Sequence, residues 1–210
     1  MKSPVLVFDF DGTIADTHHY IIEISNRLAP EFKYKLIAPE EIDDLKDKSA
    51  QEIIVHLHVP FLKIPAIVAR GKREFQINIA GIQPIKGLEV ILTRLKDLNV
   101  QIGILSSNTT ENINQFLKNH NLHCFNFIAT TSKIWGKDIS LKDLIHKNNL
   151  PKEQVIYIGD ETRDVLAAKK LGVKVAAVTW GYNSALALKN TTRIFSSTNL
   201  KNCSLCADKV

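Results

Sequence analysis

Short apolar runs, each followed at once by polar residues, recur along this chain of 210 residues. Residues 5–8 are apolar throughout, which is typical of a strand that is buried on both faces of a parallel sheet. Residues 100–105, 155–158 and 173–178 have the same character, and a weaker run covers residues 125–130. These runs predict the strands of a parallel sheet.

Residues 16–83 show no strand pattern and instead repeat their apolar positions at helical spacing. One repeat, from Tyr20 to Leu28, predicts a helix. Proline has no backbone N–H and disrupts the helical hydrogen bonds, so we expect Pro30 to end this helix.

Two further helices are predicted in the same stretch. Ser49 and Glu52 form a capping box ahead of an apolar run, which indicates that a helix begins there. Residues 65–79 predict another helix, which Gly81 ends. The first strand is therefore separated from the later strands by an all-helical insertion.

Helices and strands alternate in the rest of the chain. Residues 88–98 present one apolar helical face, and Asn108 with Glu111 is predicted to cap the next helix. A further helix is expected to start near Ser140, and the helix before Gly172 is expected to end at that glycine. The remaining predictions are a short helix at 185–188 and an edge strand near Ile194.

This order predicts an α/β protein with a Rossmann-like parallel-sheet core and an inserted all-helical cap domain. Residues 1–15 and 84–210 are assigned to the core, and residues 16–83 to the cap. The chain is long enough for one such core with a modest insertion.

Composition narrows the class of protein. The chain is 45% hydrophobic and 23% charged, and its net charge is +5, with lysine and arginine scattered along it. This scatter argues against a nucleic-acid-binding tail, and no apolar run is long enough for a membrane span or a signal peptide. The few cysteines lack a disulfide framework, so we expect a cytoplasmic protein. They are Cys124, Cys203 and Cys206, and the lone CxxC formed by the last two is interpreted as incidental.

Two carboxylates follow the first predicted strand, on either side of Phe10. Ligands of parallel sheets bind beyond the carboxyl ends of the strands, where Asp9 and Asp11 would lie. Side chains two residues apart point the same way in extended backbone, so the two carboxylates would repel each other. Mg²⁺ would relieve that repulsion, and Gly12 allows the sharp turn that follows.

Polar residues also follow two later strands. Ser106 ends the second buried strand and Asp160 follows the third, with Asp164 four residues further on. Two lysines, Lys133 and Lys137, lie between the weaker apolar run and the third buried strand.

These residues form four motifs in a fixed order. They are DFDGT at 9–13, a strand ending in Ser106, Gly-Lys at 136–137 and GDETRD at 159–164. Together they resemble the motifs of the haloacid dehalogenase-like phosphohydrolases over residues 3–184. The chain departs from many relatives in having Asp138, where they carry proline after the lysine.

The resemblance implies a role for each matching residue. Asp9 would attack phosphorus to form an aspartyl-phosphate, and Asp11 would protonate the leaving group. Lys137 would offset negative charge as the third catalytic residue, with Lys133 as the alternative active-site lysine. Mg²⁺ would be held by Asp9, the Asp11 main-chain carbonyl and Asp160, with support from Asp164. The implied phosphate- or substrate-binding residues are Gly12, Thr13, Ser106, Ser107 and Asn108.

The predicted function is hydrolysis of a small phosphorylated metabolite by a phosphoglycolate phosphatase-like enzyme, present as a monomer or homodimer. A dehalogenase needs no proton for its leaving halide, so Asp11 favours phosphate chemistry. A helical cap would close over the site and exclude bulky substrates. Lys46, Lys48 and Ser49 are polar candidates for contact with the substrate, although a solvent-exposed helix start with Ser49 as its N-cap explains all three at least as well.

Two alternatives remain open. Sugar-phosphate mutases related to β-phosphoglucomutase share this core and carry a histidine near the cap hinge, where this chain has Ile21. His18 and His19 lie nearby but out of register. The other alternative is a regulatory protein that kept the fold without turnover, although every catalytic position is filled here.

Overall fold

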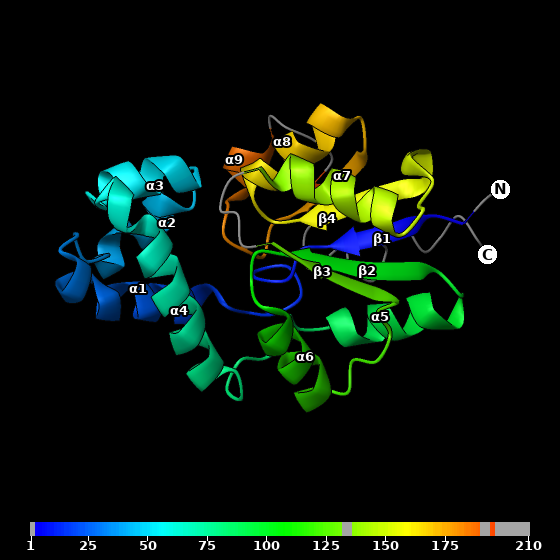
Figure 1. Ribbon diagram of the computed structural model, residues 1–210, viewed down its shortest axis with the longest axis horizontal. Coiled ribbons are helices and arrows are strands. Elements are labelled where there is room, and N and C mark those ends of the chain that lie inside the picture. Colours follow the sequence, from blue (N-terminus) through cyan, green and yellow to red (C-terminus); the bar gives the residue numbers. More distant parts are fainter. Residues whose placement is uncertain (1–2, 132–135, 190–193, 196–210) are drawn as a thin grey trace.

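The structure is a computed structural model and describes residues 3–131, 136–189 and the backbone of 194–195. A parallel sheet forms its centre, with the strand order β3-β2-β1-β4-β5-β6 (Figure 1). Its strands are β1 (Val5–Phe8), β2 (Gln101–Ser106), β3 (Phe127–Thr130), β4 (Val155–Gly159), β5 (Lys174–Val178) and β6 (Ile194–Phe195). The predicted α/β fold with a parallel sheet is therefore confirmed.

Helices cover both faces of the sheet, which explains the unbroken apolar run of β1. Leu6 and Phe8 share a buried cluster with residues of α5 and α6, whereas Val5 and Val7 share another with residues of α7 and α8. These two pairs of helices lie on opposite faces of the sheet (Figure 1). These helices are α5 (Leu88–Asp97), α6 (Thr110–Asn119), α7 (Lys137–Lys147) and α8 (Thr162–Leu171). A 3-10 turn, η3 (Lys152–Gln154), precedes β4, and the short helix α9 (Ala185–Lys189) follows β5.

Residues 16–83, all of them described, contain helices and turns and lie to one side of the sheet (Figure 1). Ile24 and Leu28 of α1 and Phe75 of α4 join the main core, so these two helices are attached to the rest of the protein by buried contacts. The elements are α1 (His18–Phe32), η1 (Pro39–Glu41), α2 (Ile42–Leu45), α3 (Ala50–His56), η2 (Phe61–Lys63) and α4 (Ile64–Asn78).

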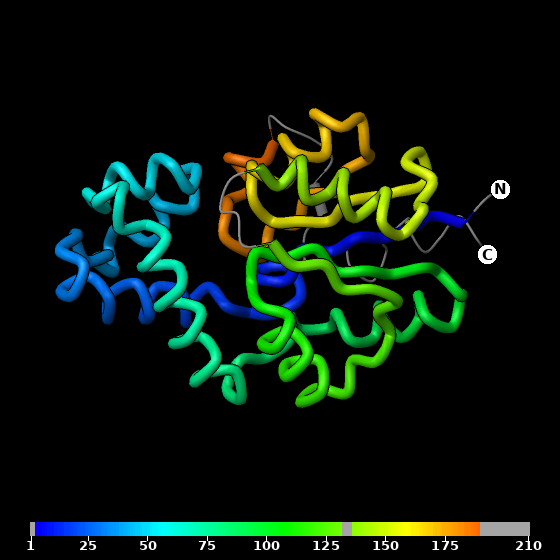
Figure 2. The backbone as a smooth tube through the Cα atoms, in the orientation of Figure 1, coloured from blue at the N-terminus to red at the C-terminus, as the bar shows by residue number. Residues whose placement is uncertain are grey.

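The chain leaves the sheet region and returns to it at one place (Figure 2). Ala15 and Pro84 form an antiparallel bridge, flanked by a hydrogen bond of 2.8 Å from the Asp16 N–H to the carbonyl of Gln83. The predicted boundaries, after residues 15 and 83, fall at this bridge. That residues 16–83 form a separate domain stays a prediction.

Two predicted helix limits were wrong. Pro30 does not end α1, which continues to Phe32 and closes with Lys33 in the left-handed conformation. Proline removes one N–H wherever it lies in a helix, and only two residues of α1 follow Pro30, so little of the helix is affected. The helix expected near Ser140 begins at Lys137, because Gly136, with φ +89°, turns the chain directly into α7. The capping box of Ser49 and Glu52 is confirmed at the start of α3.

No single helix in the described part of the chain is long and apolar enough to cross a membrane. One bent pair, Ala50–His56 with Phe61–Asn78 at 119°, meets that test by length and composition alone.

Candidate active site

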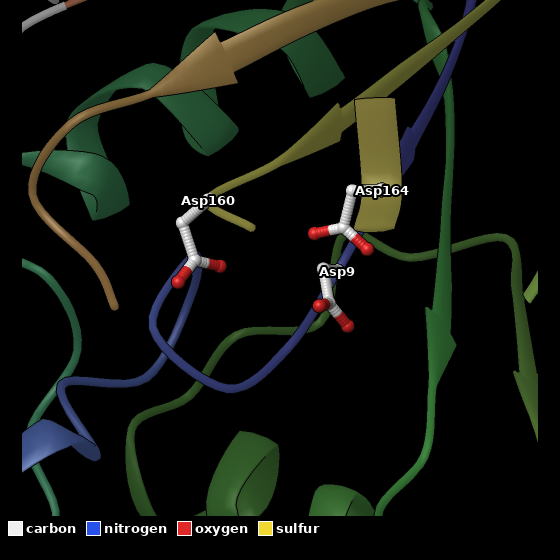
Figure 3. Close-up of side chains that lie close together, drawn as sticks. All are labelled: Asp9, Asp160 and Asp164. Carbon is white, nitrogen blue, oxygen red and sulfur yellow. The ribbon is translucent and has the colours of Figure 1, made fainter. Parts of the chain in front are cut away.

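Three carboxylates gather at the carboxyl ends of β1 and β4 (Figure 3). Asp9 follows β1, Asp160 follows β4, and Asp164 lies in the first turn of α8. All three are buried, and one oxygen from each lies within 4.8 Å of the others. Carboxylate oxygens at this spacing suit a hard divalent cation, so this cluster can hold a metal ion.

Lys137 is the cation that faces this cluster. Its ammonium nitrogen is 2.6 Å from Oδ2 of Asp9 and also forms an ion pair with Asp164. The side chain is only 9% exposed, because α7 begins at this residue, beside the ends of the strands. The structure thus brings the predicted lysine to Asp9. The alternative, Lys133, lies outside the described residues.

The negative charge of these three carboxylates exceeds the positive charge of the side chains around them. Burial raises the pKa of Asp9 to about 7, although the Lys137 ammonium lowers it. Burial and the negative charge of Glu161 raise the pKa of Asp160 well above its usual range. A buried carboxylate avoids this penalty when it coordinates a cation. The residues present therefore fit a divalent metal ion.

Asp160 is fixed by hydrogen bonds to both of its oxygens. The hydroxyl group of Thr13 donates to Oδ1 at 2.6 Å, and the N–H of Tyr182 donates to Oδ2 at 2.7 Å. Gly12 has φ +75°, and a Cβ atom there would lie 2.3 Å from Oδ2 of Asp160. Gly12 and Thr13 thus shape the surroundings of Asp160, and their predicted contact with phosphate stays a prediction.

Asp11 lies outside the carboxylate cluster. Its carboxylate is not part of that group, and it lines a pocket together with Ser107 and Asn108. The side-chain nitrogen of Asn108 lies 3.2 Å from each carboxylate oxygen of Asp11. Burial raises the pKa of Asp11 to about 6, although the hydrogen bond from Asn108 lowers it. A carboxyl group with this pKa can release and accept a proton near neutral pH.

Asn108 does not cap the helix that follows β2, as the sequence predicted. The cap of α6 is Thr109, whose hydroxyl accepts a hydrogen bond from the N–H of Asn112. The side chain of Asn108 points to Asp11 instead. Ser106 is buried, and its hydroxyl accepts a hydrogen bond of 2.9 Å from the N–H of Asn108. The hydroxyl hydrogen of Ser106 is thereby left to donate to a bound anion.

Sequence reasoning missed the residues that support the loop after β1. The buried hydroxyl of Thr17 accepts a hydrogen bond of 3.1 Å from the N–H of Gly12 and lies 2.7 Å from the hydroxyl of Tyr182. Tyr182 follows β5 at the same edge of the sheet as Asp160. In the sequence, only the position of Tyr182 after a predicted strand pointed to the site, because Thr17, its partner, lies far from it along the chain.

The polar candidates of the helical segment, Lys46, Lys48 and Ser49, do not line the pocket beside Asp11, and their contact with the substrate stays a prediction. Ser49 caps α3, and the ammonium group of Lys46 pairs with Asp43 at 2.9 Å. The backbone carbonyls of Lys46 and Lys48 instead accept hydrogen bonds from the side-chain amide of Asn183. These contacts join the helical segment to the loop after β5. Cys203 and Cys206 lie outside the described residues.

The comparisons with known proteins agree with this geometry. Residues 6–178 match the family model of the haloacid dehalogenase-like hydrolases. A phosphoglycolate phosphatase from Synechococcus elongatus is 32% identical over 184 residues, which cover 87% of each sequence.

Two solved structures share the fold. A hydrolase of the haloacid dehalogenase-like family from Streptococcus pneumoniae has a TM-score of 0.79 and 20% identity, over 96% of this chain and 97% of that chain. A mutant of CbbY from Rhodobacter sphaeroides, in complex with xylulose-(1,5)-bisphosphate, has a TM-score of 0.73 and 16% identity, over 95% and 99% of the two chains. At these identities the two structures show the fold alone. By the family match and the curated relative, this chain belongs to the haloacid dehalogenase-like hydrolase family and is a phosphatase.

Proposed function

We propose that this protein is a Mg²⁺-dependent phosphomonoesterase that hydrolyses a small phosphorylated metabolite through an aspartyl-phosphate. The observation that carries the proposal is the buried group of Asp9, Asp160 and Asp164 beside Lys137. The S. elongatus phosphoglycolate phosphatase supports a small substrate of that kind. A location in the cytoplasm and a monomeric or homodimeric state remain predictions.

Asp9, the main-chain carbonyl of Asp11, and Asp160 would hold Mg²⁺, with Asp164 in support. The ion would supply positive charge for the phosphoryl oxygens and for Asp9. Lys137 also offsets charge there, since its ammonium contacts both Asp9 and Asp164.

The reaction would proceed in two halves. The carboxylate of Asp9 attacks phosphorus, the ester P–O bond breaks, and protonated Asp11 gives its proton to the leaving oxygen. A water molecule then attacks the aspartyl-phosphate, gives a proton to Asp11, and releases inorganic phosphate. The hydroxyl of Ser106 is available to donate a hydrogen bond to a phosphoryl oxygen during both halves.

Ile21 supports hydrolysis over transfer between sugar phosphates. It lines the pocket beside Asp11, at the position where the mutase relatives carry histidine. The ring of His18 packs against Tyr182, and His19 pairs with Glu23 on the surface of α1.

Phosphate release from phosphomonoesters, measured with Mg²⁺ and with EDTA, tests the proposal. Wild type should release phosphate only with the metal, and Asp9→Asn should lower the rate about a thousandfold or more. Asp97→Asn, an exposed aspartate at the end of α5, is the matched control and should keep the wild-type rate. Full activity of Asp9→Asn would overturn the proposed mechanism.

A further inference from the structure

A pocket of about 230 Å³ lies between α1, α4 and the residues that follow β1 and β2. Asp11, Ser107 and Asn108 line its sheet side. In the proposed function Asp11 protonates the leaving oxygen, so the organic part of the substrate would enter this pocket. The inference below rests on that function. The volume is near the lower end for small-molecule pockets, which indicates a small organic group.

The walls from α1 and α4 are largely apolar. Ile21 is 38% exposed, so the pocket keeps apolar surface that a ligand would cover. A polyhydroxylated group would leave hydroxyls unpaired against these walls, at a cost of about tenfold in affinity for each one. The apolar side chains are Ile21, Ile24, Leu28, Ile67, Val68 and Phe75.

One cation interrupts this apolar lining. Lys72 of α4 is half-buried in the wall, and burial lowers its pKa while the negative charge of Asp11 raises it. No carboxylate in the described part of the chain lies within ion-pair distance of its ammonium group. Arg70, on the same helix, is paired with Glu74 at 3.1 Å. A half-buried ammonium that interacts with Asp11 only at a distance, and forms no ion pair among the described residues, favours a ligand that brings a carboxylate into contact with it.

We propose that this pocket selects phosphate esters whose organic part is a short apolar body with one carboxylate, and that Lys72 pairs with that carboxylate. Phosphoglycolate, with one methylene group between its ester oxygen and its carboxylate, is the smallest member of this class. The apolar walls extend over several side chains of α1 and α4, so carboxyalkyl phosphates with a longer chain bind better than phosphoglycolate.

Calorimetry with non-hydrolysable phosphonates and Mg²⁺ tests the pocket independently of turnover. The three ligands have equal numbers of non-hydrogen atoms and carry a carboxyalkyl, an alkyl or a polyhydroxyalkyl group. The carboxyalkyl ligand should bind at least tenfold more tightly than the polyhydroxyalkyl ligand.

Lys72→Met should reduce the preference for the carboxyalkyl ligand over the alkyl ligand about tenfold, and Lys72→Arg should restore most of that preference. Arg73→Met removes an exposed cation from the next position of α4 and should leave the preference unchanged.

Tighter binding of the polyhydroxyalkyl ligand, or an unchanged preference in Lys72→Met, would overturn the inference. Turnover of p-nitrophenyl phosphate decides separately on the proposed function. The wild type could bind the carboxyalkyl phosphonate with the expected preference and yet fail to hydrolyse the aryl ester. That result would contradict phosphatase activity but would leave the proposed selectivity of the pocket supported.

Discussion

Asn108 holds Asp11 with its side-chain amide, whose nitrogen lies 3.2 Å from both carboxylate oxygens. The amide oxygen of Asn108 accepts a hydrogen bond of 2.9 Å from the side chain of Asn112, so the nitrogen is directed at Asp11. Asn108 and Asn112 are both buried. The proposed acid therefore has a fixed orientation, provided by a residue that the sequence suggested as a helix cap and as a phosphate ligand.

Asn108→Ala should lower kcat about tenfold to a hundredfold and shift the pH profile. The hydrogen bond from Asn108 favours the ionised form of Asp11, whose pKa is about 6. Without that bond the pKa rises, so Asp11 keeps its proton to higher pH. The limb of the pH–rate profile that reports protonated Asp11 should move to higher pH.

The matched control is Asn119→Ala, which removes an exposed amide at the end of α6, the helix that follows Asn108. It should change neither kcat nor the pH profile. An Asn108→Ala enzyme with a lower kcat and an unmoved profile would show that Asn108 acts only on structure.

The metal-free protein should lose stability as pH rises from about 4 to about 7. Over this range the folded state keeps a proton on Asp9, whose pKa is raised to about 7, whereas the unfolded chain has released it. Stability therefore falls with rising pH, and Asp160, whose pKa is also raised, adds to the fall. Thermal unfolding in EDTA at several pH values measures this slope.

Mg²⁺ should reverse this loss of stability, because it binds the ionised carboxylates of the folded state. At 100 times its Kd, Mg²⁺ adds about 2.7 kcal/mol to the free energy of unfolding. Asp9→Asn should flatten the slope in EDTA. The surface carboxylate of Glu41, with its pKa lowered to about 2, acts in the opposite direction only below about pH 5, where the unfolded chain still binds its proton, so the slope is measured from pH 5 to 7. A melting temperature that rises from pH 5 to 7 in EDTA would contradict the assignment.

Asn183→Asp should loosen the helical segment. The amide nitrogen of Asn183 donates to the carbonyls of Lys46 and Lys48 at 2.9 and 3.0 Å, and its oxygen accepts from the N–H of Thr162. The aspartate keeps the acceptor for Thr162 but places a carboxylate oxygen against two carbonyl oxygens. Proteolysis near residue 47 should become faster, and KM should rise about tenfold.

Asn148→Asp is the control, since Asn148 also donates to a carbonyl, that of Leu144, but lies at the end of α7. It should leave proteolysis near residue 47 and KM as in wild type. Equal effects of the two variants would attribute the result to the new charge rather than to the contact with the helical segment.

Tyr157→Phe should stabilise the protein or leave its stability unchanged. The hydroxyl group of Tyr157 is buried and forms no hydrogen bond of normal geometry among the described residues, although the Lys137 ammonium lies near it. Removing an unpaired buried hydroxyl removes a cost of about 1 to 3 kcal/mol. Tyr34→Phe is the contrasting variant and should lose about 1 kcal/mol, because that hydroxyl donates to the carbonyl of Ser25 at 2.7 Å. Denaturant unfolding measures the stability of both variants. A loss of stability in Tyr157→Phe would show that the Tyr157 hydroxyl forms a stabilising hydrogen bond.

The sequence by itself determined the strands and the residues that follow them. The apolar run of β1 predicted that this strand is buried on both faces of the sheet. Parallel strands have their carboxyl ends at one edge of the sheet, so Asp9 and Asp160 were expected at that edge, where the pairing of β1 with β4 brings them together. The capping box could also be predicted from the sequence, since its two partners, Ser49 and Glu52, lie within one turn of the helix.

Only the tertiary structure decided how side chains from distant parts of the chain pair. Asn108 looked like a helix cap in sequence, but the fold brings Asp11 within reach of its amide, 97 positions earlier in the chain. Pro30 is tolerated because it falls in the last turn of α1, a position that depends on where the helix ends. Lys72 lines the pocket beside Asp11 because α4 packs against α1. Local patterns cannot encode such contacts, because they depend on the packing of elements that are far apart in sequence.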